Sequence, residues 1–221
     1  MIKLYDYELS GNCFKVRQLL AWLSVSYTRV PVNFYPGREH KSAAFMDNIN
    51  PLGQIPVIDD DGYLLRDAQA IMVYLASCHD PARKWYPDDP RLRGEITVWL
   101  ATADEITRTA SAARLHDALG YPFDIDACRS GARAVFRTLD DHLAERASNG
   151  FRWLVGDHPT IADLACFPYA ALASEGGIAL DEFPALRRWI WDFRHLPGFI
   201  GMSGIFVPNP ALVPAQAMAV A

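Results

Sequence analysis

The sequence lacks the features of nucleic-acid-binding and membrane-spanning proteins. Its 221 residues carry a net charge of −5, and no basic run is longer than the pair Arg187 and Arg188. Nucleic-acid binding usually requires a basic patch, so we expect no nucleic-acid partner. No apolar stretch approaches the roughly 20 residues that a membrane-spanning helix needs, so we expect no membrane span.

Cysteine is also scarce. Cys13, Cys78, Cys128 and Cys166 are widely spaced and form no Cys-x-x-Cys pair. This pattern suits a reducing cytoplasm better than a disulfide framework. A strand pattern begins at residue 2 and leaves no room for a signal peptide. We therefore expect a cytoplasmic protein, and the abundance of alanine and arginine favours a bacterial source.

Several common catalytic motifs are missing. The histidines show no metal-ligand spacing, so we expect no metal. There is no glycine-rich nucleotide motif after a strand, no phosphate loop and no serine-hydrolase elbow. Function must therefore be sought in other patterns.

The first third of the chain alternates strand and helix patterns, and hydrophobic residues make up 51% of the sequence, enough for a buried core. We predict strands near 2–6, 27–32, 55–59 and 62–65 and helices near 12–24, 42–48 and 67–77. The order is βαβαββα. We place this α/β domain at residues 1–78.

The rest of the chain is predicted to be helical. Residues 79–90 are rich in proline and aspartate and form the predicted linker. Helical patterns follow over about 91–118, 125–147, 160–174 and 184–196, so we expect an all-helical domain at 91–206. The alanine- and proline-rich segment 207–221 has no periodicity and is predicted to be an irregular tail.

The segment from Asn50 to Ile71 is the most informative part of the sequence. Pro56 interrupts an apolar run and cannot donate to a sheet, so it should mark a strand start, an edge or a bend. A cis bond at this proline would turn the backbone of Ile55 towards a ligand. Asp67 and Ala68 then open a helix, whose free N–H groups bind carboxylates. Together these features suggest a site for a small acidic peptide.

A third element comes from the N-terminus. The strand pattern at residues 2–5 leads into Ser10, and a helix with one apolar face follows. Ser10 therefore lies at a strand-to-helix turn, with its hydroxyl near a helix N-terminus.

With these segments in place, the chain resembles the glutathione S-transferase family, most closely its bacterial theta-, beta- and nu-like branches of the serine type. The matching segments are Leu9–Val16, His40–Lys41, Asn50–Val57, Asp67–Ile71 and Pro159–Leu164. The resemblance implies a thioredoxin-like N-terminal domain, an all-helical C-terminal domain, a homodimer and a role in detoxification. It also implies glutathione as co-substrate, with transfer of its thiol to a small electrophile.

The resemblance assigns the catalytic role to Ser10. Its hydroxyl would stabilise the thiolate of glutathione, with Asn12 as a second candidate in the same turn. Lowering the thiol pKa by two units requires about 2.7 kcal/mol of differential stabilisation. The alternative role of Ser10 is to cap the helix. Tyr5 and Tyr7 lie before the turn and are expected to pack in the core.

The resemblance also implies the residues that bind glutathione. Ile55 would bind the cysteinyl backbone through its main chain, helped by Pro56 and Gln54. Asp67 would receive the γ-glutamyl amino group while also opening its helix. The remaining predicted contacts are His40 and Lys41 at the glycine carboxylate, unless they form only a solvated basic pair, and Ala68 at the γ-glutamyl carboxylate.

Ala68 departs from the family pattern. Relatives usually carry Ser or Thr at this position, so Ala68 keeps the backbone N–H but lacks the hydroxyl. A hydrogen bond to a charged group contributes about 1.5–3 kcal/mol, which predicts weaker glutathione binding than in a relative with serine.

The second-substrate pocket carries no motif, so the sequence does not identify the electrophile. The candidates from the first long helix are Thr107, Arg108, Ser111 and Arg114. The polarity of Thr107, Arg108 and Arg114 suggests a polar or anionic second substrate.

Two alternative functions remain open at this point. Cys13 lies three residues after Ser10, which suggests glutathione-dependent disulfide reduction or isomerisation unless Cys13 is simply buried. The loss of the hydroxyl at Ala68 leaves room for a non-catalytic binding protein. The segment Thr160–Asp163 is predicted to be a structural capping box.

Overall fold

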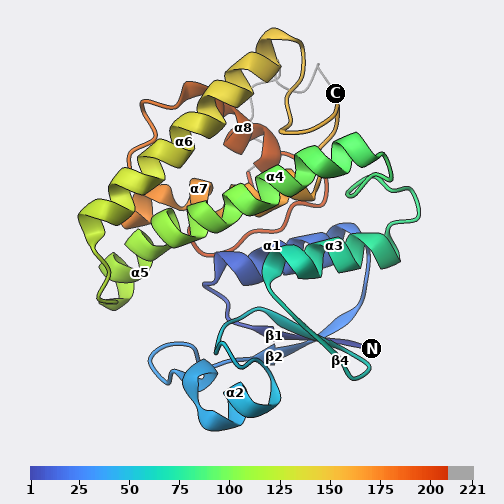
Figure 1. Ribbon diagram of the computed structural model, residues 1–221, viewed down its shortest axis with the longest axis vertical. Coiled ribbons are helices and arrows are strands. Elements are labelled where there is room, and N and C mark those ends of the chain that lie inside the picture. Colours follow the sequence, from blue (N-terminus) through green and yellow to red (C-terminus); the bar gives the residue numbers. More distant parts are fainter. Residues whose placement is uncertain (209–221) are drawn as a thin grey trace.

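The computed structural model describes residues 1–208 and begins with a four-stranded sheet (Figure 1). The strands are β1 (Ile2–Asp6), β2 (Tyr27–Pro31), β3 (Val57–Asp60) and β4 (Tyr63–Arg66). Their spatial order is β2-β1-β3-β4. β1 is parallel to β2 and antiparallel to β3, with Leu4 opposite Ile58, and β3 is antiparallel to β4.

Three α-helices complete the N-terminal half. They are α1 (Gly11–Trp22), α2 (Ala43–Asn48) and α3 (Ala68–His79), and the 3-10 helix η1 (Glu39–Lys41) precedes α2. α1 and α3 lie between the sheet and the helical half, whereas α2 lies on the other side of the sheet (Figure 1). The order βαβαββα agrees with the sequence prediction, and the thioredoxin-like fold is confirmed.

The C-terminal half is helical, as predicted. Its elements are α4 (Pro90–Ile106), the π-helix η2 (Thr107–Ser111), α5 (Ala112–Leu119), α6 (Ile125–Ser148), α7 (Ile161–Ala171), the 3-10 helix η3 (Ala173–Gly176) and α8 (Pro184–Arg194). The sequence predicted one helix over 91–118. The structure instead inserts a π turn, a feature common at functional sites, between α4 and α5.

The core runs continuously through both halves. α1 packs against α7, where the ring centroids of Phe14 and Phe167 lie 6.3 Å apart. Gly11 permits this approach, because a Cβ there would lie 2.8 Å from the ring of Tyr169. α7 therefore supports the first turn of α1, which carries the predicted catalytic residues.

The predicted capping box at the start of α7 is present. The side chain of Thr160 accepts from the N–H of Ala162, and Asp163 accepts from the N–H of Thr160. Buried Asp163 also accepts from the N–H of Leu154 and the indole N–H of Trp189, each at 3.0 Å. These bonds join α7, the preceding loop and α8.

The boundaries between the halves follow from the helix ends. α3 ends at His79 and α4 begins at Pro90, so residues 80–89 connect them. Most of the predicted tail, 207–221, lies outside the described residues. Among the residues that the structure covers, no helix combines the length and apolar character needed to cross a bilayer.

Candidate functional site

A cavity of about 550 Å³ lies between the first domain and the π turn with α5. All thirteen site residues predicted from the sequence line it: Ser10, Asn12, His40, Lys41, Gln54, Ile55, Pro56, Asp67, Ala68, Thr107, Arg108, Ser111 and Arg114. Residues from both halves of the chain thus meet at one site.

Ser10 is the N-cap of α1, so the helix-capping role expected as an alternative for it is confirmed. Its Oγ accepts a hydrogen bond of 3.2 Å from the backbone N–H of Cys13. A hydroxyl accepts through its lone pairs and donates through its one proton. Capping therefore leaves the hydroxyl proton of Ser10 free for a ligand in the cavity.

Asn12 lies on the same turn and is held by Tyr169 of α7. The backbone N–H of Asn12 donates to the phenol oxygen of Tyr169 at 3.2 Å. The side-chain Oδ1 of Asn12 is buried and has no protein partner. Tyr169, which the sequence analysis did not single out, also lines the cavity. Tyr169 lies on α7, far from Ser10 in the sequence, and no sequence motif marks it.

The bond between Ile55 and Pro56 is cis, and both residues line the cavity. Buried Asn50 supports this segment, because its Nδ2 donates to the carbonyl of Gln54 at 2.9 Å. The segment therefore has the arrangement that the Asn-Pro-Leu-Gly-Gln-Ile-Pro motif predicts. A second cis bond, between Tyr35 and Pro36, was not predicted.

Asp67 and Ala68 form the start of α3. Asp67 is its N-cap and accepts from the N–H of Ala70 at 2.9 Å, leaving its other carboxylate oxygen for a ligand. Ala68 is only 3% exposed and lines the cavity at the start of the helix. The two roles predicted for Asp67, helix capping and ligand binding, are geometrically compatible.

His40 and Lys41 differ in character, which corrects the idea of a solvated basic pair. His40 is 2% exposed and stacks on Phe34, with ring centroids 4.1 Å apart. Burial, helped by the charge of Lys41, lowers the pKa of His40 to about 4, so its imidazole is neutral at pH 7. Lys41 is exposed, and its Nζ donates to the carbonyl of Leu52 at 3.1 Å.

Cys13 is buried on α1 and does not line the cavity. Burial raises the pKa of its thiol to about 12, the opposite of what a reactive cysteine requires. The structure thus favours the alternative in which Cys13 is a small packing residue.

Aromatic side chains form a wall of the cavity that the sequence analysis missed. Tyr7 stacks on Phe34 at 5.3 Å between centroids, and Phe34 stacks on Tyr121 at 6.5 Å. Phe123 continues the stack beyond Tyr121. Tyr7 lines the cavity. The expectation that it packs only in the core is therefore wrong. The aromatic residues carry no local motif.

The two arginines at the cavity are both paired with carboxylates. Arg108, whose side chain is 70% exposed, pairs with Glu105 at 2.7 Å. Arg114, whose side chain is 12% exposed, pairs with Glu175 and donates to the carbonyl of Leu9 at 2.9 Å. The charge of Arg114 is therefore balanced by a partly buried partner, whereas the pair formed by Arg108 is exposed and weak.

Among the described residues, no group of three or more potential metal ligands occurs. The cavity thus combines polar residues from both halves of the chain with an adjoining aromatic wall.

Comparison with known proteins decides the family. The glutathione S-transferase N-terminal domain model matches residues 4–83, and the C-terminal domain model matches residues 122–190. The chain belongs to the glutathione S-transferase family. Members of this family bind glutathione, and the expected transferase function is confirmed at this level.

Individual relatives agree with this assignment. The chain is 29% identical to the maleylacetoacetate isomerase of Pseudomonas aeruginosa, covering 85% of this chain and 88% of the relative. It is 28% identical to glutathione S-transferase GstB of Escherichia coli, covering 89% and 95%. The crystal structure of a possible glutathione S-transferase from Rhodopseudomonas palustris superposes with a TM-score of 0.82 at 26% identity, covering 99% and 96%.

Proposed function

We propose that this transferase binds glutathione in the cavity between its halves and that Ser10 activates the thiol. The observation that carries the proposal is that residues from the Ser10 turn, the Ile55–Pro56 segment and the start of α3 line one cavity. Each offers the chemistry that one part of the peptide requires. The arrangement supports assignment to the serine-type members of the family.

Ser10 acts as a hydrogen-bond donor to the sulfur. Its Oγ is oriented by the N–H of Cys13, so the hydroxyl proton can stabilise the thiolate once the thiol has released its proton to solvent. The start of α1 adds favourable potential. The thiolate then attacks an electrophilic carbon, forming a carbon–sulfur bond while the leaving group departs with its electron pair. Asn12, in the same turn, is the second candidate donor.

The peptide is held by backbone groups and by opposite charges. The main chain of Ile55 binds the cysteinyl unit, while the free oxygen of Asp67 pairs with the γ-glutamyl ammonium. The N–H of Ala68 binds the γ-glutamyl carboxylate without the usual hydroxyl. Lys41 supplies charge near the glycine carboxylate. The other predicted contacts are Gln54, Pro56 and neutral His40, which can donate one hydrogen bond.

The aromatic wall supports a planar apolar electrophile as second substrate. Phe34 and Tyr121 are nearly parallel, with an interplanar angle of 14°, and Phe123 extends the same surface. Aromatic rings favour offset stacking on such surfaces. Thr107, Arg108 and Ser111 remain candidates for polar contacts at the pocket.

We further propose a homodimer in a reducing cytoplasm with a role in detoxification. Exposed apolar side chains support an interface: Tyr63 and Leu64 on β4 and Val98 on α4. All four cysteines lie in the described part of the chain and are free, which suits a reducing compartment.

The alternatives are less well supported. Disulfide reduction through a protein thiol would need a reactive cysteine at the site, but Cys13 is buried with a raised pKa. A non-catalytic binding role is favoured only by Ala68.

Calorimetric titration with reduced glutathione tests the proposal. Saturable binding, together with thiolate absorbance that is lost in Ser10→Ala but kept in Ser10→Thr, is the expected result. Absence of binding would contradict the proposal. Saturable binding without thiolate absorbance would favour a binding protein instead.

A further inference from the structure

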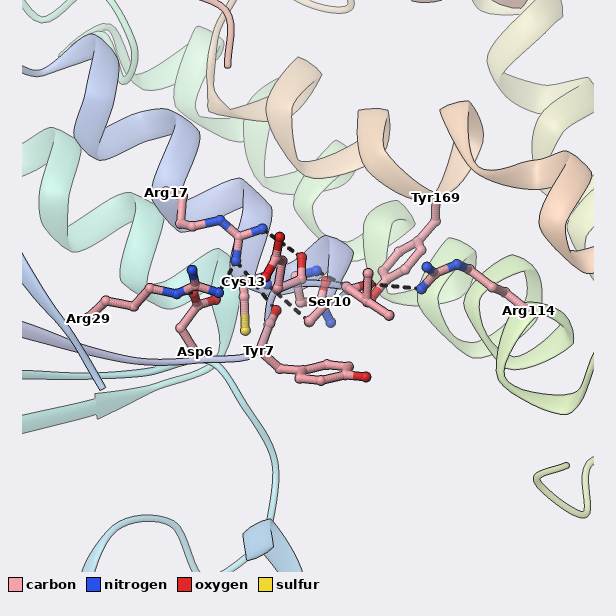
Figure 2. Close-up of polar contacts among 11 residues, drawn as sticks. Asp6, Tyr7, Ser10, Cys13, Arg17, Arg29, Arg114 and Tyr169 are labelled. Atoms are coloured by element: carbon pink, nitrogen blue, oxygen red, sulfur yellow. Dashed lines mark hydrogen bonds and ion pairs between the residues drawn. The ribbon is translucent and has the colours of Figure 1, made fainter. Parts of the chain in front are cut away.

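The turn that precedes Ser10 is held by two arginines from different halves of the protein (Figure 2). Arg17 of α1 donates to the carbonyl of Glu8 at 3.0 Å and makes a longer contact of 3.4 Å to that of Tyr7. Arg114 of α5 donates to the carbonyl of Leu9 at 2.9 Å. Consecutive carbonyls leading to Ser10 are therefore bound from both sides.

Arg114 is itself firmly held in the helical half. Its Nε pairs with the carboxylate of Glu175 in η3, and its side chain is 12% exposed. η3 packs closely on α5, since a Cβ at Gly176 would lie 2.9 Å from the backbone nitrogen of Arg114. The guanidinium thus has one edge on Glu175 and a second donor on Leu9. Charge-assisted bonds of this kind are strong and directional.

We propose that Arg114 is a positioning residue for Ser10 and not an anchor for an anionic substrate. The carbonyl of Leu9 belongs to the peptide group that joins Leu9 to Ser10. Fixing it limits rotation of this peptide and holds the Ser10 hydroxyl in the orientation that its bond from Cys13 defines. This inference rests on the proposed role of Ser10 in glutathione activation.

The ion pair with Glu175 separates the two roles of Arg114. An anchoring arginine keeps donors and net charge available to the substrate. Arg114 has its charge balanced by Glu175 and one donor committed to the main chain. Its contribution should therefore be present before any second substrate enters the cavity.

Arg93 provides a matched control. It also combines a carboxylate with a carbonyl, pairing with Asp88 and donating to the carbonyl of Pro87 at 2.7 Å. It does not line the cavity, and both of its partners precede α4, away from α5 and η3. Arg93→Met removes the same kinds of interaction without disturbing the turn before Ser10 or the pair of Arg114 with Glu175.

The test measures the pKa of the bound glutathione thiol by its thiolate absorbance, without a second substrate. Arg114→Met should raise this pKa by about one unit, since weakened positioning reduces stabilisation of the thiolate. Turnover at a pH well below both pKa values should fall about tenfold, because the thiolate fraction falls by that factor. The loss should be equal for an uncharged aryl halide and a carboxylate-bearing analogue. Arg93→Met should leave the thiol pKa unchanged.

Two outcomes would overturn the inference. One is an unchanged thiol pKa in Arg114→Met, and the other is a loss of activity confined to the carboxylate-bearing substrate. If Arg114→Met fails to fold, the double variant with Glu175→Gln removes the unpaired carboxylate and allows the same measurement. If the wild type itself shows no bound thiolate, the proposed function fails, and that result is distinct from an unchanged pKa in the variant.

Discussion

Replacing Lys15 with methionine should stabilise the folded protein at neutral pH. Lys15 lies on α1 and is fully buried, and its Nζ has no hydrogen-bond partner in the protein. The ammonium lies 5.6 Å from the ring centroid of Tyr169, and the carboxylates of Asp104 and Asp67 are near enough to favour its charge. These contacts only partly offset the loss of water, because buried charges need close partners.

The size of the effect follows from the pKa of Lys15. Burial lowers the pKa of its ammonium from 10.5 to about 8, with the nearby acidic groups opposing the shift. A depression of this size corresponds to an unfavourable contribution of about 3 kcal/mol to folding stability when the group is charged. Methionine fills a similar volume and carries no charge, so Lys15→Met should raise the free energy of unfolding by about that amount at pH 7.

The pH dependence identifies the cause. Below about pH 8 the ammonium is charged in both folded and unfolded states, so the full penalty is present. Between about pH 8 and 10.5 the folded protein has released this proton while the unfolded chain still binds it, so wild-type stability rises relative to the variant. Above about pH 10.5 the penalty has disappeared.

Urea unfolding of wild type and Lys15→Met from pH 7 to pH 10.5 measures this difference directly. The gain of about 3 kcal/mol should shrink steadily above pH 8. Lys84→Met is the matched control, because Lys84 also lies over an aromatic ring, 5.8 Å from that of Trp85, but is exposed. A constant difference between wild type and Lys15→Met across this pH range would refute the reasoning.

Three further predictions concern the site and its support. Ala68→Ser should tighten glutathione binding about 10- to 100-fold, because the serine hydroxyl restores a hydrogen bond to the γ-glutamyl carboxylate. Ala70→Ser is the control, since Ala70 is exposed, and it should leave binding unchanged. An unchanged Kd for Ala68→Ser in calorimetry would contradict this prediction. Ser10→Ala should reduce kcat/KM about 100-fold in kinetic assays. It should also lower the free energy of unfolding by about 1 kcal/mol in urea, because the helix cap is lost. Ser10→Thr should retain most of the activity and most of the stability. Asp163→Ala should lower the free energy of unfolding by about 3 kcal/mol in the same urea assay, because it leaves the buried N–H groups of Leu154, Thr160 and Trp189 unpaired. A loss under about 1 kcal/mol would contradict the structural role of Asp163.

The half of the site proposed to bind glutathione was predictable because its signals are local. Ser10, Pro56 and Asp67 each stand at an element boundary, where a proline or a capping side chain leaves a mark in the sequence. Short sequence patterns likewise predicted the capping box at Thr160 and the order of strands and helices in the first domain.

The second-substrate side was predicted less well. Thr107, Arg108, Ser111 and Arg114 do line the cavity, but no sequence signal indicated that Glu105 and Glu175 pair with the two arginines. Glu175 is distant from Arg114 in sequence, and no periodicity links them. The π turn at 107–111 also has no signal distinct from that of an ordinary helix.

The sequence by itself determined the fold class, the element order and the segments that meet at the cavity, since these depend on hydrophobic periodicity, capping, proline chemistry and short family motifs. Only the tertiary structure decided which aromatic rings form the pocket wall, that His40 is neutral, and that Arg114 reaches Leu9. Stacking, burial and ion pairing depend on which distant segments the core brings together. That proximity is set by the packing of α1 on α7 and of α5 on η3, and by no single stretch of chain.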